Sequence, residues 1–367
     1  MMLKHSKKHL LWRLCTIFFF ISFVAIGCSS SSSDNDNGGS NLDLLNGTYY
    51  LGLFADTGSG NWNQMNKVDF DGAGNLEAAT VYDSADAYDS SGNTINYSGP
   101  YDIAADGTFT FTETDIKGIL SSDGNMMTTI DTDASDSDKE ISIGAAVAES
   151  TGKDDTLLTG TYTLCQIRQD GAAMKASRIN VTFDGAGSLT GTVADDSDDG
   201  PSDVDALAGT YSVAANGRLD MSIIGLPKTF DGSVAPDGES LVIIDDDNDG
   251  EVLLMVGVKA STGKTVSSLN GTYQVHVFGG DDSGAWASLV DATFDGNGTL
   301  SAVPIAASDN DLTAPPDGSY SVEDDGALTI DMTNEKGMIS PSGDIFVVGD
   351  ASNTDSEVSI VIGVKKS

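Results

Sequence analysis

The chain has 367 residues, of which 39% are hydrophobic, and its 56 acidic and 18 basic residues give a formal net charge of −38. Four of the basic residues lie in the first 28, so the rest of the chain has 14 basic against 56 acidic residues, a net charge of −42. This charge repels nucleic-acid phosphates and anionic lipid, so no nucleic-acid partner is expected. The length suffices for two or three domains.

The first 27 residues have the pattern of a signal peptide. A basic start, MMLKHSKKHLLWR, precedes an apolar run from Leu14 to Ile26. This run is too short to span about 30 Å of hydrocarbon comfortably. It ends in AIGC, and a polar sequence follows Cys28. This order resembles a bacterial lipoprotein signal, which implies that Cys28 is lipidated and becomes the new N-terminus. The alternative is an ordinary secreted protein cut nearby.

Residues 28–44 are rich in Ser, Asp, Asn and Gly. Such a composition cannot bury a core, so we interpret the segment as a flexible tether. Acyl chains contribute about 0.8 kcal/mol per buried methylene, so a lipidated Cys28 would hold the chain at a membrane. The predicted location is the bacterial cell envelope, at the periplasmic or surface face of the outer membrane.

Cysteine use predicts no intrachain disulfide. Cys15 would leave with the signal and Cys28 would carry lipid, so Cys165 remains alone. Cys165 lies in the strand-like run TYTLCQI and is interpreted as a buried small residue. The chain must therefore be held together by hydrophobic cores.

One eight-residue phrase occurs three times, as DFDGAGNL, TFDGAGSL and TFDGNGTL, with its phenylalanines at Phe70, Phe183 and Phe294. A GTY phrase precedes each copy, a G-x-Y phrase follows each copy, and each copy closes on an apolar run: ISIGAAV, VLLMVGV or VSIVIGV. A fixed period of this kind indicates a repeated structural unit. We therefore predict three domains, at 45–153, 157–264 and 269–367.

The segments between the repeated phrases alternate apolar and polar residues, as in Tyr49, Leu51 and Leu53. Period two with aromatic and β-branched residues predicts half-buried strands, and the Asp-Gly and Asn-Gly pairs between them predict hairpin turns. About eight strands per copy, joined in sequence, predict an all-β fold of three eight-stranded antiparallel meander barrels. β-sandwiches remain the alternative. Each repeat is expected to bury its alternate side chains without help from the others.

The G-T-Y opening and the meander resemble lipocalin-like (calycin) barrels. The combination LNGTY…FDGxGxL…GxYxV resembles exported bacterial repeat proteins. The chain has Tyr49, Tyr162 and Tyr273 where the lipocalin pattern has Trp. The resemblance implies a barrel that could hold one small ligand.

The loops predicted for one end of each barrel are acidic and differ in length, and function generally resides on loops held by a rigid scaffold. Asp245, Asp247 and Asp249 stand at alternating positions of DDDNDG. Oxygen ligands at positions 1, 3 and 5 suit Ca²⁺, so these residues form a candidate calcium site. The bidentate acid expected at position 12 is replaced by Val256, and a solvated acidic hairpin is the alternative. No other cofactor is expected.

Trp62 and Trp286 each precede the phenylalanine of the repeated phrase by eight residues, where the second copy has Lys175. A tryptophan at a loop end can contact a ligand or partner, or it can simply cover the barrel end. His276 lies between two inward valines and would be the one histidine left after removal of the signal, so we interpret it as a strand-surface residue and predict no catalytic residues.

The sequence thus favours a lipid-anchored cell-envelope protein that binds or displays, without catalysis. The alternatives are a carrier of small apolar ligands with cavities inside the barrels, and a calcium-dependent surface adhesin. An enzyme acting on glycans is a further alternative, because carboxylate pairs are abundant. The expected partners are the membrane, through the lipid, and an unknown protein, glycan or small molecule.

Overall fold

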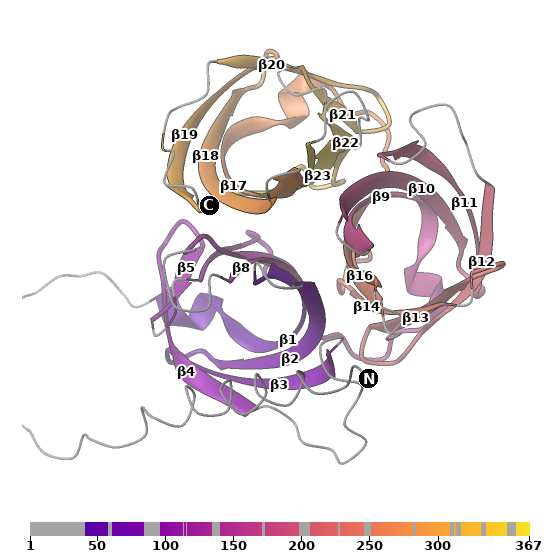
Figure 1. The fold of residues 1–367 in the computed structure, drawn as a ribbon, viewed down its shortest axis with the longest axis horizontal. Helices are drawn as coiled ribbons and strands as arrows, with labels where there is room; N and C mark the ends of the chain where they lie inside the picture. The colour runs from indigo at the N-terminus through magenta and orange to yellow at the C-terminus, as the bar shows by residue number, and fades with distance from the viewer. Residues whose placement is uncertain are drawn as a thin grey trace, which may run out of the picture. The chain divides into compact units, whose positions relative to one another are not determined.

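The computed structural model describes residues 41–367 except 58–60, 84–95, 113, 115, 134–139, 171–172, 198–205, 227, 246–250, 282–283, 309–311, 313–316, 332–334 and 351–356. The described part forms three closed barrels, each of eight antiparallel strands in meander order (Figure 1). The prediction of three tandem barrels is confirmed, and the sandwich alternative is wrong, because the last strand of each copy pairs with the first.

Barrel 1 consists of β1(Asn46–Asp56), β2(Asn61–Asp71), β3(Asn75–Asp83), β4(Asn96–Ile103), β5(Thr108–Phe111), β6(Lys117–Leu120), β7(Met126–Asp131) and β8(Ile141–Ala148). Barrel 2 consists of β9(Thr159–Asp170), β10(Ala173–Asp184), β11(Ser188–Asp196), β12(Ala206–Val213), β13(Arg218–Ile223), β14(Thr229–Val234), β15(Ser240–Asp245) and β16(Glu251–Lys259). Barrel 3 consists of β17(Asn270–Asp281), β18(Gly284–Asp295), β19(Thr299–Ala307), β20(Gly318–Val322), β21(Ala327–Ile330), β22(Glu335–Ile339), β23(Ile345–Asp350) and β24(Val358–Lys365). A short 3-10 turn precedes each barrel: η1(Asn41–Leu44), η2(Asp155–Leu157) and η3(Val266–Ser268).

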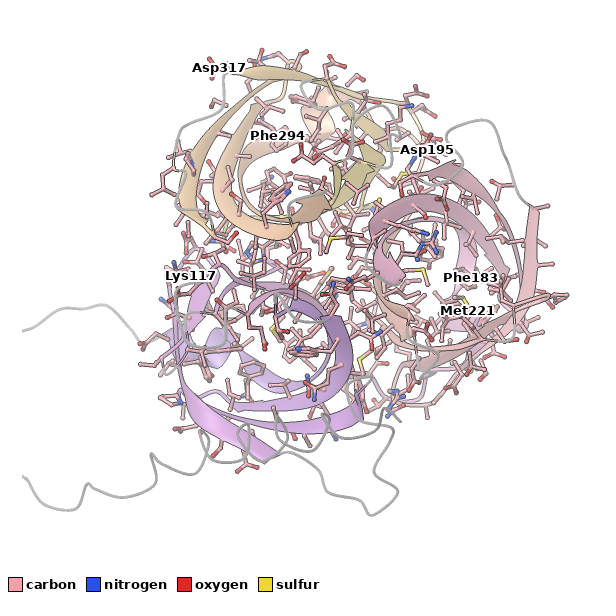
Figure 2. All side chains as sticks on the ribbon, in the orientation of Figure 1. Lys117, Phe183, Asp195, Met221, Phe294 and Asp317 are labelled. Carbon is pink, nitrogen blue, oxygen red and sulfur yellow. The ribbon has the colours of Figure 1, made fainter. Side chains whose placement is uncertain are left out.

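The repeated aromatic residues meet inside each barrel. In barrel 2 the ring of Phe183 packs edge-on between the rings of Tyr162 and Tyr211, at centroid distances of 5.4 and 5.0 Å. The matching trios have the same edge-to-face geometry: Tyr49–Phe70–Tyr101 and Tyr273–Phe294–Tyr320. Figure 2 shows Phe183 and Phe294 inside their barrels. The repeated GTY, FDGxG and G-x-Y phrases therefore supply residues of the inner core as well as turns. Aromatic pairs of this kind add about 0.5–1.5 kcal/mol of stability beyond burial.

The FDGxG phrase forms the turn between the second and third strands of each barrel. Oδ1 of Asp184 accepts hydrogen bonds from the backbone N–H groups of Ala186 and Ser188, at 2.7 and 2.9 Å. These bonds hold the pKa of the Asp184 carboxyl below its usual value. Gly185 and Gly187 have φ values of 74° and 92°, which L side chains rarely adopt. The aspartate and both glycines are thus required by the backbone path of the turn.

The end of each barrel that carries this turn is here called the turn end. It is closed by the short segment that precedes the first strand. The residue after each 3-10 turn is a fully buried leucine at Leu45, Leu158 or Leu269. Its carbonyl accepts a hydrogen bond from a core tyrosine, as from Tyr101 Oη to Leu45 O at 2.7 Å. The opposite end, here called the mouth, carries the longer connections.

A second apolar core lies between the barrels. It is built from the outward faces of strands whose inward faces fill the barrels, and each barrel contributes ten buried residues to it. The rings of Phe54 in barrel 1 and Phe278 in barrel 3 meet edge-on at 5.5 Å. A Cβ added to Gly52 would lie 2.8 Å from Val242 of barrel 2, so the backbones approach closely. Each barrel buries its inward side chains by itself, as expected, but many outward side chains are buried only against the other barrels, which was not expected.

The closing apolar runs explain this shared core. In β24 seven consecutive residues, from Val358 to Val364, are buried, so both faces of the strand are covered. A strand covered on both faces has a continuous apolar sequence instead of an alternating one. β8 has the same pattern from Ile141 to Val147.

Three equivalent backbone hydrogen bonds join consecutive barrels in a cycle. The N–H of Ser150, after barrel 1, donates to Asn216 O in barrel 2 at 3.1 Å, and Ser261 N–H donates to Asp325 O in barrel 3 at 3.0 Å. Ser367 N–H, after barrel 3, returns to Asp106 O in barrel 1 at 3.1 Å. Residues 40–367 accordingly form one compact unit.

Candidate functional site

The mouths are the candidate sites. The turn ends are closed by buried leucines, and the inner clusters fill the adjoining part of each barrel. The lining of a mouth follows from strand parity. In β9 the side chains of Tyr162 and Leu164 belong to the inner cluster, so Gln166 and Arg168 lie on the same inward face. In β10 Phe183 and Val181 point inward, so Ser177 and Lys175 do too.

Trp62 and Trp286 lie at the mouths of barrels 1 and 3. Both are half-buried and on inward faces, and they pair across the sheet with Ala55 and Gly279. A Cβ at Gly279 would lie 2.6 Å from the Trp286 ring, so the ring lies directly over this glycine. Each tryptophan thus keeps part of its surface exposed at the rim of a barrel; contact with a ligand or partner stays a prediction.

Barrel 2 has a different mouth. Lys175 stands where the other barrels have tryptophan, and its cross-strand partner is Arg168. Gln166 differs as well, because the equivalent residues of barrels 1 and 3 are the apolar Leu53 and Val277. Three adjacent inward positions that are apolar in barrels 1 and 3 are therefore polar or cationic in barrel 2.

Carboxylates accompany these cations. Asp196 is paired across the sheet with Ser177, whose Oγ donates to Asp196 Oδ2 at 3.0 Å. The same oxygen lies 3.7 Å from an Arg168 guanidinium nitrogen. Beside the neighbouring strands β14 and β15, Lys228 Nζ donates to Oδ2 of Asp245 at 3.0 Å, and the Asp245 side chain is completely buried.

This placement bears on the candidate calcium site. Asp245 is the last residue of β15 and points inward, because Ile243 and Leu241 on the same face belong to the inner cluster. Asp247 and Asp249 lie outside the described residues. Among the described residues no three acidic, histidine or cysteine side chains gather where they could hold a metal. The calcium site stays a prediction.

His276 and Cys165 lie between barrels and away from the mouths. His276 is on the outward face of β17, as its position between two inward residues predicts, but it is fully buried instead of on the surface. Its Nε2 lies 3.2 Å from Gln274 Oε1, and burial lowers its pKa to about 3. Cys165 is fully buried in the shared core, and burial raises the pKa of its thiol to about 12. The prediction that Cys165 is a buried small residue is confirmed.

Cys28, the signal segment and the tether lie outside the described residues. No helix in the described part of the chain is long and apolar enough to cross a membrane.

Comparisons with known proteins give only distant structural likenesses. No family model matches the chain, and no curated protein matches it. Among solved structures, a DUF3598-family protein of unknown function from Nostoc punctiforme is 8% identical, with a TM-score of 0.23; the match covers 60% of this chain and 99% of that one. Transferrin binding protein B of Haemophilus parasuis is 11% identical, with a TM-score of 0.29, 87% of this chain and 76% of that one being covered. The Neisseria meningitidis protein of the same name is 10% identical, with a TM-score of 0.29. The match covers 83% of this chain and 66% of that one. These likenesses carry no argument about the fold or the function of this chain.

Proposed function

We propose that the chain is a lipid-anchored cell-envelope protein that binds through the mouths of its barrels and does not catalyse a reaction. The observation that carries the proposal is the difference between mouths on one repeated scaffold. The turn ends of the three barrels keep the same aromatic trio and the same turn. The mouths pair Trp62 with Ala55, Arg168 with Lys175, and Gly279 with Trp286. A repeated scaffold whose rims differ is suited to several binding specificities.

Two features oppose catalysis. After removal of a signal peptide His276 is the single histidine, and it is buried between barrels with a pKa near 3, so it holds no proton at neutral pH. The Cys165 thiol is buried and protonated, which removes its nucleophilic form. Neither side chain lies at a mouth. General acid–base or nucleophilic chemistry by these residues is therefore not supported.

A carrier of apolar ligands is less well supported than binding at the rim. The inner cluster of each barrel places fully or nearly fully buried side chains from strands all round the barrel. In barrel 1 the ring centroid of Phe111 lies 6.3 Å from that of Phe70 and 5.5 Å from that of Phe109. The lower interior is thus already occupied by side chains, which leaves the rim for a ligand.

Replacing Cys28 with serine is expected to release the chain from the membrane. The chain with its own leader is produced in a bacterial host and labelled with radioactive palmitate. Wild type should carry label and sediment with membranes, whereas Cys28→Ser should lose essentially all label. Cys165→Ser is the matched control, because Cys165 is buried in the folded protein, and it should keep both properties. A Cys28→Ser protein that still carries label would contradict the anchor.

Tryptophan fluorescence is expected to report ligands at the mouths of barrels 1 and 3. Trp12 lies in the signal, so Trp62 and Trp286 are the two tryptophans of the remaining chain. A soluble oligosaccharide or peptide that binds there should shift the emission, and alanine at the contacting tryptophan should weaken binding about tenfold or more. Single Trp→Phe variants assign the signal to one barrel. Calorimetric binding that leaves both emissions unchanged would place the contact elsewhere.

A further inference from the structure

A row of inward residues crosses neighbouring strands at the mouth of barrel 3. Cross-strand pairs join four of its members in the order Trp286, Gly279, Ser359 and Asp350. Ser359 Oγ also donates to Oε1 of Glu335, on β22, at 3.4 Å. Inner-cluster residues lie an even number of positions away on each of these strands, so the row faces inward. These five residues, here called the mouth row, place an indole ring and two carboxylates on one concave surface.

The indole of Trp286 reaches from its own strand over the neighbouring strand β17. A Cβ added to Gly279 would lie 2.6 Å from the ring, so glycine leaves the room that the ring needs. Trp286 is half-buried, and part of its ring therefore stays exposed in the mouth. Asp350 stands two strands beyond Gly279, a backbone separation of about 10 Å. An ammonium group within about 6 Å of the ring centroid and about 3 Å from a carboxylate oxygen fits this span.

The basic residues of the third repeat do not neutralise the mouth row. Between residues 269 and 364 the sequence has two of them, His276 and Lys336. His276 is on the outward face of β17 and buried against barrel 1, and its low pKa keeps it uncharged at neutral pH. Lys336 pairs with Gly349, and a Cβ added to Gly349 would meet Cys165 of barrel 2. Lys336 therefore also lies on the outer face of barrel 3.

Further acidic residues stand at the same end of barrel 3. Asp281 ends β17, and Glu357 precedes β24. The charge around this mouth is therefore negative, which repels an anionic ligand and attracts a cation. A hard metal ion prefers oxygen ligands and gains little from an indole, whereas the face of an indole attracts an organic ammonium group.

Barrel 1 contains a related row. Its cross-strand pairs run in the order Trp62, Ala55, Ser142 and Asp131. The apolar Ile116 stands where barrel 3 has its inward glutamate. This row has one carboxylate fewer, so it should attract a cation less strongly than the mouth row of barrel 3.

Barrel 2 has a different set of residues at the equivalent positions. Leu253 replaces the serine, Arg168 replaces the glycine and Lys175 replaces the tryptophan. Two cations and no aromatic ring occupy these positions, which disfavours an ammonium ligand. The combination of ring and paired carboxylates thus distinguishes the mouth of barrel 3 from the other two.

We propose that the mouth of barrel 3 binds a small organic cation, held by its ammonium group between the Trp286 ring and the carboxylates of Asp350 and Glu335. The inference rests on the proposed binding function and assigns a ligand class to one mouth. Among aromatic side chains tryptophan attracts a cation most strongly. A carboxylate has about four acceptor positions, so it can bond an ammonium group and keep its protein partners.

Isothermal titration calorimetry with choline, ethanolamine and 3,3-dimethyl-1-butanol tests this site. The third probe has the shape of choline without its charge. The purified chain is titrated at constant ionic strength near 0.15 M, where salt screens charges over about 8 Å. Wild type should bind one equivalent of choline or ethanolamine with a Kd below about 1 mM, and the neutral probe at least about tenfold more weakly.

Matched variants locate the binding. Trp286→Leu removes the ring, and Asp350→Asn removes one charge at nearly constant shape, so each should weaken binding about tenfold. Trp286→Phe keeps an aromatic face and should lose less affinity than Trp286→Leu. Glu323→Gln removes an exposed acid at the turn end of the same barrel and should leave binding unchanged. The ammonium probe that binds should also raise the melting temperature of wild type, which checks the site without any substitution.

Absence of saturable binding of both ammonium probes to wild type would overturn the proposal. Equal affinity for the neutral probe would also overturn it, because the ligand would then be bound by shape alone. Equal weakening by Glu323→Gln and Asp350→Asn would mean that binding follows overall charge. The fluorescence titration tests the proposed function separately: a chain that rejects both ammonium probes but shows a shift of Trp286 emission with an oligosaccharide keeps the binding function and loses this ligand class.

Discussion

Replacing Phe278 with alanine is expected to cost about 3–5 kcal/mol of unfolding free energy, although Phe278 lies on the outer face of its barrel. The side chain has no exposed surface and its ring packs edge-on against Phe54 of barrel 1. Removing it leaves a cavity where barrels 1 and 3 meet, so the cost should match that of an inner-core phenylalanine. Equilibrium unfolding in urea, followed by circular dichroism, measures the loss.

Val303→Ala provides the matched control. Val303 also lies on the outer face of a barrel 3 strand, but 64% of it is exposed. Its truncation should change stability by no more than about 0.5 kcal/mol. A cost below about 1 kcal/mol for Phe278→Ala would show that the outer faces do not form a common core.

The sequence predicted the individual barrels well because their determinants are local. Asp-Gly turns, period-two alternation and the repeat spacing each specify the path of a few neighbouring residues. The assembly of barrels depends on contacts such as Phe54 with Phe278, which are distant in sequence and leave no local signature. The available signal was the run VSIVIGV in β24, whose lack of alternation indicates two covered faces.

The candidate site was predictable in part. The fixed spacing of Trp62 and Trp286 located two mouths, and the same spacing revealed Lys175 as the departure in the second copy. Arg168 was missed, although it follows Tyr162 and Leu164 in phase and therefore had to face inward. The contact between Lys228 and Asp245 was also missed, although β14 and β15 are neighbouring strands and Asp245 pairs with Phe230, two residues from Lys228.

His276 lies in the same interface as Phe278 and makes the stability of the protein sensitive to acid. It faces the backbone of β7 near Thr129, and its Nε2–H donates to the neutral Gln274. Burial is the main cause that lowers its pKa to about 3, while the Thr129 backbone acts weakly in the opposite direction. The unfolded chain has the ordinary histidine pKa of about 6.5.

The sign of the effect follows from these two values. Above pH 6.5 the histidine is neutral in both states and contributes no pH dependence. Between about pH 6.5 and pH 3 the unfolded chain binds a proton that the folded protein does not, so unfolding becomes more favourable as the pH falls. At pH 4.5, two units below the unfolded pKa, the loss amounts to about 2–3 kcal/mol.

Replacing His276 with glutamine should remove this loss, because glutamine stays neutral at every pH. The drop in unfolding free energy between pH 7 and pH 4.5 is therefore expected to be about 2–3 kcal/mol smaller in His276→Gln than in wild type. Urea unfolding of both proteins without the leader, at matched ionic strength, measures the difference. Carboxylates titrate in the same range, but they are common to both proteins, and no other histidine remains to confuse the comparison. An identical drop in the two proteins would mean that water reaches His276 in the folded state and that the interface between barrels 1 and 3 is open.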